Sequence, residues 1–280
     1  MNSKVAVITG ASSGIGLLTA VELARRGHRV VASMRNLERR ARLDEAAQRA
    51  GVAGRLDVRR LDVTEFASLP GFVDAIANDH GRIDVLVNNA GFAVAGFAED
   101  LRLEEIRRQF ETNFFGQVAM TKAVLPVMRR QRSGHIIMVS SVSGRMGQPV
   151  VSSYSASKFA LEGWSEALRM ETRSLGIHVV LVEPGSFETD IWTRNAQIGE
   201  FALSQESPNH QRGARFAEQV KKVRKAEATP VARLIARIAE DPNPRLRYLI
   251  GHDAHLMMWL RALLPWKAYE KLVRRATRID

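Results

Sequence analysis

A short buried strand that runs into a glycine-rich loop is the feature that most restricts how this chain of 280 residues can fold. The run Lys4–Ile8, K-V-A-V-I, reads as the strand, and Thr9–Gly16, T-G-A-S-S-G-I-G, is the loop. A helical pattern follows to about Arg26, where Gly27 is placed to end it. A strand, glycine loop and helix in this order bring backbone N–H groups and the positive end of a helix dipole to a bound phosphate. We therefore predict a dinucleotide-binding loop.

Short runs rich in Val and Ile alternate with longer helical patterns along the chain, as a parallel sheet with crossover helices requires. The predicted strands are Val5–Thr9, Arg29–Ser33, Leu56–Leu61, Val85–Asn88, Ile136–Ser140, Val179–Glu183 and Tyr248–Ile250. The predicted fold class is therefore α/β: a single-domain Rossmann fold with a doubly wound, parallel, seven-stranded sheet and helices on both faces. Ligands of such sheets bind at the carboxyl ends of the strands.

A phenol and an ammonium group lie four residues apart in the run Y-S-A-S-K, as Tyr154 and Lys158, and Ser141 precedes the tyrosine by thirteen residues. On a helix this spacing puts both groups on one face. Two unit charges about 4 Å apart at an effective dielectric near 20 attract by roughly 4 kcal/mol, enough to lower a tyrosine pKa from ~10 to roughly 7 or 8. We expect a proton-transfer site, although an isolated pair of this spacing is also typical of an ordinary amphipathic helix.

Six motifs in order resemble the classical short-chain dehydrogenase/reductase family over about residues 4–250. They are T-G-x-x-x-G-x-G at Thr9–Gly16, N-N-A-G at Asn88–Gly91, Asn113, Ser141, Y-x-x-x-K at Tyr154–Lys158 and P-G-x-x-x-T at Pro184–Thr189. Within that family, Arg145–Pro149 and Tyr154–Gly163 are most similar to the branch that contains 17β-hydroxysteroid and some retinol dehydrogenases. The resemblance implies an oxidoreductase that interconverts a carbonyl and a secondary alcohol with a nicotinamide cofactor.

The resemblance also implies a role for each motif residue. Tyr154 would exchange a proton with the substrate oxygen, Ser141 would hydrogen-bond that oxygen, Lys158 would lower the tyrosine pKa and bind the nicotinamide ribose, and Asn113 would position a relay water. Asp62 would lie near the adenine, or alternatively cap the helix from Thr64. The full set of expected cofactor contacts is Gly10, Ser12, Ser13, Gly14, Ile15, Gly16, Arg35, Asp62, Val63, Asn89, Ala90, Gly91, Tyr154, Lys158, Pro184, Gly185, Phe187 and Thr189.

The residues after the second predicted strand indicate whether the chain binds NAD(H) or NADP(H). NAD enzymes often carry an acidic residue there, which accepts hydrogen bonds from the adenosine ribose. Here Ser33, Met34 and Arg35 supply no acid, and the guanidinium of Arg35 suits a phosphate. NADP(H) is therefore predicted over NAD(H). The alternative for Arg35 is a surface arginine ahead of a helix that Asn36 caps.

After Thr189 the sequence becomes polar and poorly periodic over Arg194–Arg224, and in the family that it resembles this segment covers the substrate. We expect residues 1–250 to form the catalytic domain, with a lid at about 190–225, and residues 251–280 to form an amphipathic helical extension. Expected substrate contacts are Ser141, Gln148, Tyr154, Phe187 and Trp192, with Phe92, Ala93, Val94, Pro149, Val150, Ile191, Phe201 and Phe216 completing an apolar wall.

An apolar pocket favours a lipophilic carbonyl or alcohol, steroid-, retinoid- or fatty-like. A polar substrate such as a sugar or an acyl thioester is the alternative among enzymes. A non-catalytic NADP(H)-binding regulatory protein is a further alternative, but it would not need Ser141, Tyr154 and Lys158.

The composition argues against several kinds of site. The chain has no cysteine, which excludes disulfides and thiolate chemistry, and His252 and His255 alone do not make a metal site, so no metal is expected. A net charge of +11 attracts polyanions, but the arginines are spread over many helix faces and no nucleic-acid-binding motif is present. With no apolar run of about 18 residues and a strand directly after Met1, we expect a cytoplasmic protein.

Two parts of the sequence predict contacts with another subunit or with a membrane. The helical patterns over Thr112–Arg130 and after Tyr154 are long, and by analogy with the family we expect a homodimer or homotetramer that pairs through them. The tail His255–Arg278 is amphipathic and basic. It is expected either to make weak peripheral contact with an anionic membrane or to pack over the lid or a partner subunit, and a membrane-associated interaction module is a further functional alternative.

Overall fold

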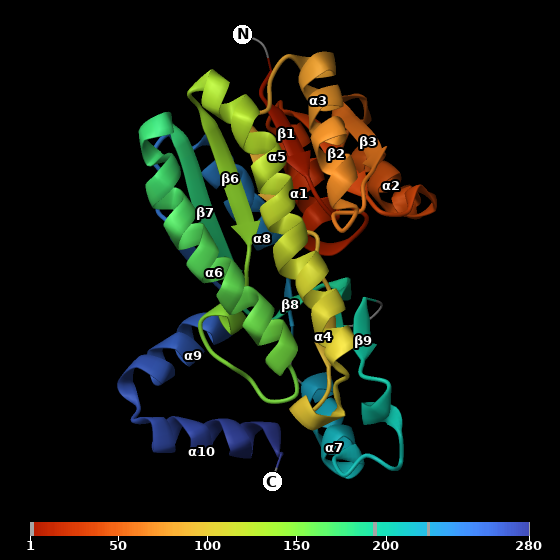
Figure 1. Cartoon of the computed structure of the whole chain (residues 1–280), viewed down its shortest axis with the longest axis vertical. Coiled ribbons are helices and arrows are strands. Elements are labelled where there is room, and N and C mark those ends of the chain that lie inside the picture. The colour runs from red at the N-terminus through yellow and green to blue at the C-terminus, as the bar shows by residue number, and fades with distance from the viewer. Residues whose placement is uncertain (1–2, 193–194, 223–224, 280) are drawn as a thin grey trace.

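A parallel seven-stranded sheet forms the centre of the computed structural model, which describes residues 3–192, 195–222 and 225–279 (Figure 1). The strand order is β11-β7-β6-β4-β1-β2-β3, and every neighbouring pair is parallel. The strands are β1 (Val5–Ile8), β2 (Arg29–Met34), β3 (Leu56–Arg60), β4 (Val85–Asn88), β6 (Gly134–Val139), β7 (Ile177–Pro184) and β11 (Arg247–Ile250). The predicted single-domain Rossmann fold is confirmed.

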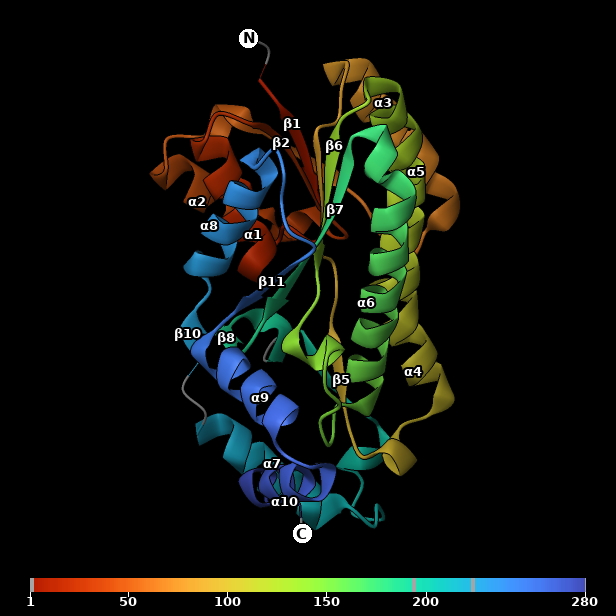
Figure 2. The same cartoon turned by 90° about the vertical axis from the view of Figure 1, so that its left-hand side faces the viewer.

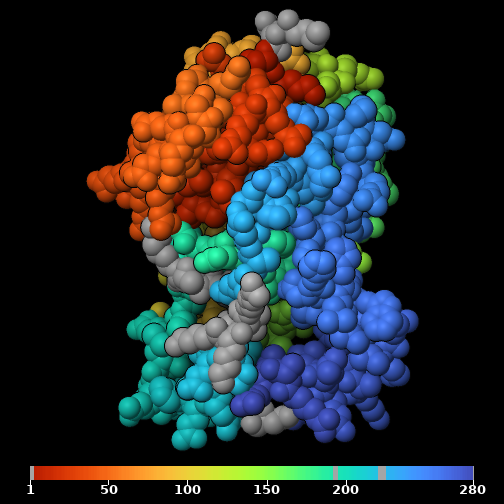
Figure 3. All heavy atoms as spheres, turned by 180° about the vertical axis from the view of Figure 1, so that it is seen from behind, coloured from red at the N-terminus to blue at the C-terminus, as the bar shows by residue number. Residues whose placement is uncertain are grey.

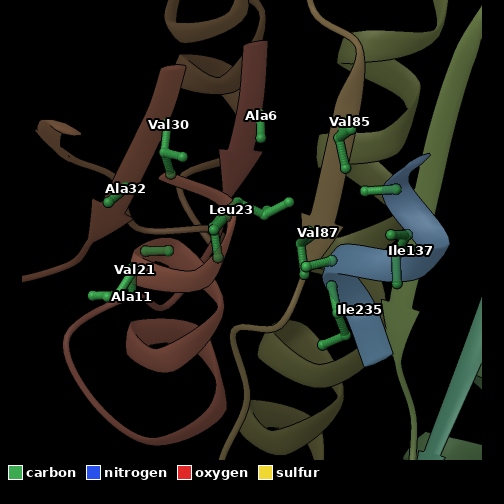
Figure 4. Packing of buried hydrophobic residues seen from close by; sticks show 14 of the residues in the cluster. Ala6, Ala11, Val21, Leu23, Val30, Ala32, Val85, Val87, Ile137 and Ile235 are labelled. Carbon is green, nitrogen blue, oxygen red and sulfur yellow. The ribbon is translucent and has the colours of Figure 1, made fainter. Parts of the chain in front are cut away.

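Helices cover both faces of the sheet (Figure 2). On one face lie α1 (Gly14–Arg25), α2 (Ala41–Arg49) and α8 (Thr229–Glu240), and on the other lie α3 (Leu69–His80), α5 (Gly116–Gln131) and α6 (Ser152–Thr172). The strands are apolar on both sides because both sides are buried. In the first layer, strand residues such as Val30, Val87 and Ile137 pack against Leu23 of α1 and Ile235 of α8 (Figure 4).

The strand order places the loops that follow β1 and β4 side by side. From β1 the chain proceeds outward through β2 to β3, and β4 then returns to the other side of β1, where Ile8 pairs with Val87. Such a reversal of direction opens a crevice at the carboxyl ends of the two strands. The glycine loop after β1 and the N-N-A-G motif after β4 therefore meet at one place.

The predicted helix over Thr112–Arg130 is present, but it begins in a π-helical turn and follows directly on another helix. Helix α4 (Leu103–Phe110) leads into a π-helical turn, Glu111–Phe115, and α5 follows directly. A π turn inserts an extra residue into the helical ladder and rotates the side chains around it, which is why such turns recur at functional sites. Here the rotated residues include Asn113.

The segment after Thr189 is more regular than its sequence indicates. It contains a 3₁₀ turn at Asp190–Trp192, strand β9 (Ala196–Ile198), a 3₁₀ turn at Phe201–Leu203 and α7 (His210–Lys222). Two short strand pairs, β5 (Ala93–Ala95) with β9 and β8 (Phe187–Glu188) with β10 (Ala226–Glu227), tie it to the rest of the chain. Helix α7 makes tertiary contacts such as that of the Arg212 guanidinium, 4.5 Å from the Phe97 ring centroid, and the role of this segment as a substrate lid stays a prediction. Arg194 and Arg224 lie outside the described residues.

The chain ends in two helices, α9 (His252–Leu263) and α10 (Trp266–Thr277), set at an angle to each other beyond the carboxyl ends of the strands (Figure 1). Their inner sides form a small core with the loop after β6, through Ala254, Tyr269, Val142 and Met146. Seen from behind, they lie next to the residues of α7 (Figure 3). Throughout the described residues, helices fall short of the length and apolar character that crossing a membrane requires.

Two histidines stack near the amino ends of β6 and β7, with the ring centroids of His135 and His178 5.1 Å apart. His135 Nε2 lies 2.8 Å from the carbonyl oxygen of Asp241, and His178 Nδ1 lies 2.8 Å from a guanidinium nitrogen of Arg173. Burial lowers the pKa of both imidazoles, and together with the charges of the neighbouring His135 and Arg173 it brings that of His178 to about 4. Both rings are therefore neutral in the folded protein near neutral pH.

This pair predicts a loss of stability in mild acid. The pKa of His178 is about 4 in the folded protein and ~6.5 in an unfolded chain, so between these values the unfolded state binds more protons. The free energy of unfolding should therefore fall as the pH is lowered through this window. Urea unfolding at a series of pH values should show a weaker pH dependence for His178→Gln than for the unchanged protein, and the exposed His252→Gln serves as control. An unaltered dependence in His178→Gln would contradict this account.

Candidate active site

A cleft of about 710 Å³ lies at the carboxyl ends of the strands. Met34, Arg35 and Arg39 line one part of it, and Ser141 and Tyr154 line another. Among the expected cofactor contacts, the lining includes Gly10, Ser12, Ser13, Gly14, Ile15, Arg35, Asp62, Val63, Asn89, Ala90, Gly91, Tyr154, Lys158, Pro184, Gly185, Phe187 and Thr189. The sheet thus gathers motifs from the whole length of the chain around one cavity.

The amide of Asn89 holds the glycine loop in place. Its Nδ2 donates to the carbonyl oxygens of Thr9 at 2.9 Å and Gly10 at 3.0 Å. Gly16 lies beneath the cavity wall, where a Cβ would stand 2.4 Å from Asn89 Nδ2 and from the Gly10 oxygen. The absence of that Cβ lets the first turn of α1 approach the loop after β4. No acidic residue occupies this turn, so its N–H groups suit the phosphates of a dinucleotide.

Ser141, Tyr154 and Lys158 come together where β6 ends and α6 begins. Tyr154 and Lys158 lie one turn apart on α6, with only 4% and 3% of their surfaces exposed. The Lys158 Nζ donates to the carbonyl oxygen of Val139 at 2.8 Å and stands 5.7 Å from the centroid of the Tyr154 ring. Ser141 is hydrogen-bonded to the phenol, and its Oγ also accepts from the backbone N–H of Ser143 at 3.1 Å.

Burial, rather than the neighbouring ammonium, controls the protonation of the phenol. Desolvation raises the pKa of Tyr154 to about 12, and the hydrogen bond to Ser141 only partly opposes this. The same burial lowers the pKa of Lys158 to about 8, against the attraction of Glu162. The expectation that Lys158 acidifies Tyr154 was therefore wrong for the protein by itself, because both charged forms are desolvated and the ammonium is bound to a carbonyl. The phenol carries its proton at neutral pH.

Asn113 is fully buried and holds the loop after β4. Its Nδ2 donates to the Phe92 oxygen at 2.9 Å, and its Oδ1 accepts from the Phe92 N–H at 3.0 Å. A third contact, from Nδ2 to the Ser157 hydroxyl at 3.2 Å, reaches α6 one residue before Lys158. The side chain thus joins two parts of the site, and its role with a relay water stays a prediction.

The other part of the cleft is basic. Arg35 and Arg39 are exposed at its wall, and Arg39 was missed because its place depends on the 3₁₀ turn Leu37–Arg40. The predicted cap on this turn is confirmed, since Asn36 Oδ1 accepts from the Glu38 N–H at 2.8 Å. Asp62 lines the cleft, and its Oδ1 accepts from the Thr64 N–H at 3.0 Å. This contact closes a turn, and the alternative of a cap on a helix from Thr64 was wrong, because the next helical turn begins at Phe66.

The expected substrate residues are only partly brought together. Phe92, Phe187 and Ile191 line the cleft beside Ser141 and Tyr154, together with the polar residues Arg108, Thr112, Asn195 and Gln197. The lining does not include the other residues expected there, and the side chain of Trp192 lies outside what the structure describes. The absent residues are Ala93, Val94, Gln148, Pro149, Val150, Phe201 and Phe216. Gln148 is half-buried on the loop after Ser141, and its contact with substrate stays a prediction.

A buried ionic network lies behind Lys158. Glu162, one turn further along α6, is 4% exposed and accepts from Arg247 Nε at 3.0 Å. The same nitrogen lies 3.3 Å from Glu183, which is 1% exposed and also pairs with Arg145 at 3.2 Å. Burial raises the pKa of Glu162. The four-residue spacing from Lys158 was a signal for Glu162, whereas Arg247 and Glu183 meet only through the pairing of β7 with β11.

Asp253, on the first turn of α9, holds the loop after β7. Its Oδ2 accepts from the Ser186 N–H at 2.7 Å. Both Gly185 and Gly251 make room for this carboxylate, since a Cβ on either would come within 2.7 Å of its oxygens. No sequence signal connects Asp253 to this loop. Within the described part of the chain, no three His, Asp or Glu side chains gather in a way that could hold a metal ion.

The model of the short chain dehydrogenase family matches residues 4–198. This chain is a member of the short-chain dehydrogenase/reductase family. An uncharacterized oxidoreductase of Bacillus subtilis, YusZ, is 42% identical over 98% of this chain and 99% of its own length. A 3-ketodihydrosphingosine reductase of Bacteroides thetaiotaomicron is 38% identical over 90% of this chain and 89% of its own. Bovine retinol dehydrogenase 8, from the branch that the sequence resembles, is 44% identical over 67% of this chain and 60% of its own.

Solved structures of the family share the fold. A short-chain dehydrogenase from Streptomyces avermitilis is 32% identical and superposes with a TM-score of 0.81 over 98% of both chains. A Burkholderia phymatum member in complex with NAD is 27% identical, with a TM-score of 0.79 over 93% of both chains. A metagenomic member in complex with NADP is 25% identical, with a TM-score of 0.70 over 89% of this chain and 97% of its own. The fold therefore binds nicotinamide cofactors of both kinds.

The contact of Asp253 predicts that α9 supports the cofactor site. In Asp253→Ala the Ser186 N–H loses a charged acceptor, so we expect the free energy of unfolding to fall by about 1–3 kcal/mol and nicotinamide binding to weaken. Asp253→Asn keeps an acceptor oxygen and should retain most of both. Urea unfolding and cofactor titration check this, with Asp44→Ala, which removes an exposed ion pair to Arg40, as control. Cofactor binding as tight in Asp253→Ala as in the unchanged protein would show that the contact plays no part in the site.

Proposed function

We propose that this protein is an NADP(H)-dependent oxidoreductase that interconverts a carbonyl and a secondary alcohol on a lipophilic substrate. The observation that carries the proposal is the meeting of Ser141, Tyr154 and Lys158 in a cleft whose wall also carries Arg35 and Arg39. A non-catalytic nucleotide-binding protein would not need a serine and a buried tyrosine in contact inside that cleft.

Each side chain of the site has a distinct task in the proposed reaction. The nicotinamide, when bound, supplies or accepts the hydride. The Ser141 hydroxyl donates a hydrogen bond to the substrate oxygen and stabilises the negative charge that develops there during reduction. Tyr154 then gives its proton to that oxygen. Because burial keeps the phenol protonated, the protein alone is set for reduction, and the reverse reaction first requires the loss of this proton.

The network behind Lys158 supports the ammonium group. A buried ammonium tends to lose its proton, and burial does lower the pKa of Lys158 to about 8. The carboxylate of Glu162 opposes this by its negative charge. Arg247 in turn balances the charge of Glu162, so that a cation beside the tyrosine is retained at neutral pH.

Two features of the cleft suggest different substrates. Phe92, Phe187 and Ile191 favour a lipophilic one, and the names of the sphingosine-type and retinol-type relatives support this choice. Arg108 and Gln197, hydrogen-bonded to each other at 2.8 Å in the same lining, favour a polar one such as a sugar or an acyl thioester. A panel of long-chain, retinoid, steroid, sugar and thioester carbonyls, assayed by loss of reduced-nicotinamide absorbance, decides between them.

We further propose a homodimer or homotetramer that pairs through α5 and α6. The apolar residues Phe115, Phe159 and Met170 are 46%, 46% and 74% exposed on or next to these helices. Light scattering of the purified protein measures the assembly directly.

The proton-donor role of Tyr154 predicts the behaviour of Tyr154→Phe. This variant keeps the ring and loses only the hydroxyl, so turnover should fall by a factor of at least about 10²–10⁴, the usual contribution of general acid catalysis. Binding of NADPH should persist, because the glycine loop and Arg35 are unchanged. Steady-state assays and fluorescence titration measure the two effects separately. Turnover close to that of the unchanged enzyme would remove Tyr154 from the mechanism.

The choice of NADP(H) predicts an asymmetric effect of Arg35→Ala. Loss of a charge-assisted contact to the 2′-phosphate is worth about 1.5–3 kcal/mol, so binding of NADPH should weaken roughly ten- to hundredfold. Binding of NADH, which lacks that phosphate, should change little. Thermal stabilisation by each nucleotide is the measurement, and Arg25→Ala on α1 is the control. Equal losses of affinity for NADPH and NADH would indicate that Arg35 does not bind the 2′-phosphate.

A further inference from the structure

Helix α9 carries an exposed apolar ridge. Leu256, Trp259 and Leu263 of α9 and Trp266 at the start of α10 are each between 56% and 61% exposed. In α9 these residues recur at positions i, i+3 and i+7, so they line one side of the helix. The opposite side, with Ala254, packs into the core formed with Met146 and Tyr269. These four residues are called the apolar ridge below.

The neighbouring helix α10 is cationic on its solvent side. Lys267, Lys271 and Arg275 are exposed there. Between His252 and Ile279 the chain has six Lys or Arg residues and two acidic ones. An apolar strip beside a basic one is typical of helices that bind at the interface of an anionic bilayer.

Contacts beneath the surface hold the two helices in a fixed arrangement. The Arg261 guanidinium lies 5.0 Å from the Trp266 ring centroid and 5.5 Å from that of Tyr269, and so joins α9 to α10. Arg212 of α7 donates to the carbonyl oxygen of Ile279 at 2.9 Å and joins the end of the chain to the lid. The apolar ridge is therefore formed in advance, on two helices that lie beyond the carboxyl ends of the strands (Figure 1).

We propose that the apolar ridge and the basic side of α10 dock on the surface of an anionic lipid bilayer. A second copy of this chain is a poorer partner, because a two-fold interface sets the same patch on both subunits and would bring the basic sides together. A nucleic acid would match the charge but offers no apolar partner to Trp259 and Leu263. If the substrate is lipophilic, as proposed above, docking brings the protein to the phase in which that substrate is dissolved, but the docking itself does not depend on the substrate.

Co-sedimentation of the full chain with vesicles tests the proposal. We expect binding to phosphatidylcholine vesicles containing about 30% phosphatidylglycerol, weaker binding in high salt, and little binding to phosphatidylcholine alone. Each basic residue near such a surface contributes about fivefold in affinity, so Lys267→Gln with Lys271→Gln should weaken binding by about 25-fold. Trp259→Ser with Leu263→Ser should weaken it at least tenfold, because these side chains supply the apolar part of the contact.

Control variants on other surfaces test whether vesicle binding depends on the apolar ridge and α10 or only on the total charge and exposed apolar area of the protein. Arg233→Gln with Arg237→Gln removes two exposed charges from α8, and Leu103→Ser removes an apolar residue that is 54% exposed at the start of α4, so both should bind vesicles normally. Reduction of a water-soluble carbonyl should be unchanged in every variant, which keeps a failure of docking distinct from a failure of the proposed reaction. The proposal is overturned by absent vesicle binding, by equal losses in the control variants, by duplex DNA binding as tight as lipid binding, or by dimers that dissociate in Trp259→Ser.

Discussion

The close approach of two loops, one after β1 and one after β4, is the constraint on which the rest of the site depends. The Asn89 amide fits between the carbonyls of the glycine loop only because Gly16 has no side chain. This contact holds the glycine loop and the first turn of α1 beside the cavity. Strand pairing then brings the candidate catalytic residue Ser141 to the same edge of the sheet, since β6, which it follows, lies next to β4.

Burial is the second determinant, because it changes what the charged and ionisable groups do. It keeps the proton on Tyr154 and makes the ammonium of Lys158 easier to deprotonate. An unpaired buried charge behind these two groups would strongly destabilise the fold. Here the guanidinium of Arg247 lies between the carboxylates of Glu162 and Glu183, so each buried charge has an opposite partner. The ion network therefore supports the protonation state of the site as much as its shape.

Most of the sheet could be predicted from the sequence, since buried parallel strands read as short β-branched runs, and the glycine loop, the N-N-A-G motif, Ser141 and the P-G-x-x-x-T motif all lie at strand ends. The strand ends differ from the predicted ones by at most two residues. The remaining features rest on contacts between distant segments, which leave no local pattern. The π turn at Asn113 looks like ordinary helix in the sequence, and α7 lies in a polar, poorly periodic stretch because residues from elsewhere in the chain stabilise it. Asp253 reaches the loop after β7 only because β11, which pairs with β7, is followed directly by α9.

Within the residues that the structure describes, only the inner sides of the two C-terminal helices, α9 and α10, pack against the rest of the protein. The inner side packs against the loop after Ser141, and Asp253 secures the loop after β7, so removal of these helices would disturb the cleft whatever their outer side does. The apolar ridge contributes little burial and therefore little stability, and a fold alone gives no reason for two exposed tryptophans beside a basic strip. Surface substitutions, rather than truncation, are consequently the changes that can separate a docking role from the support of the active site.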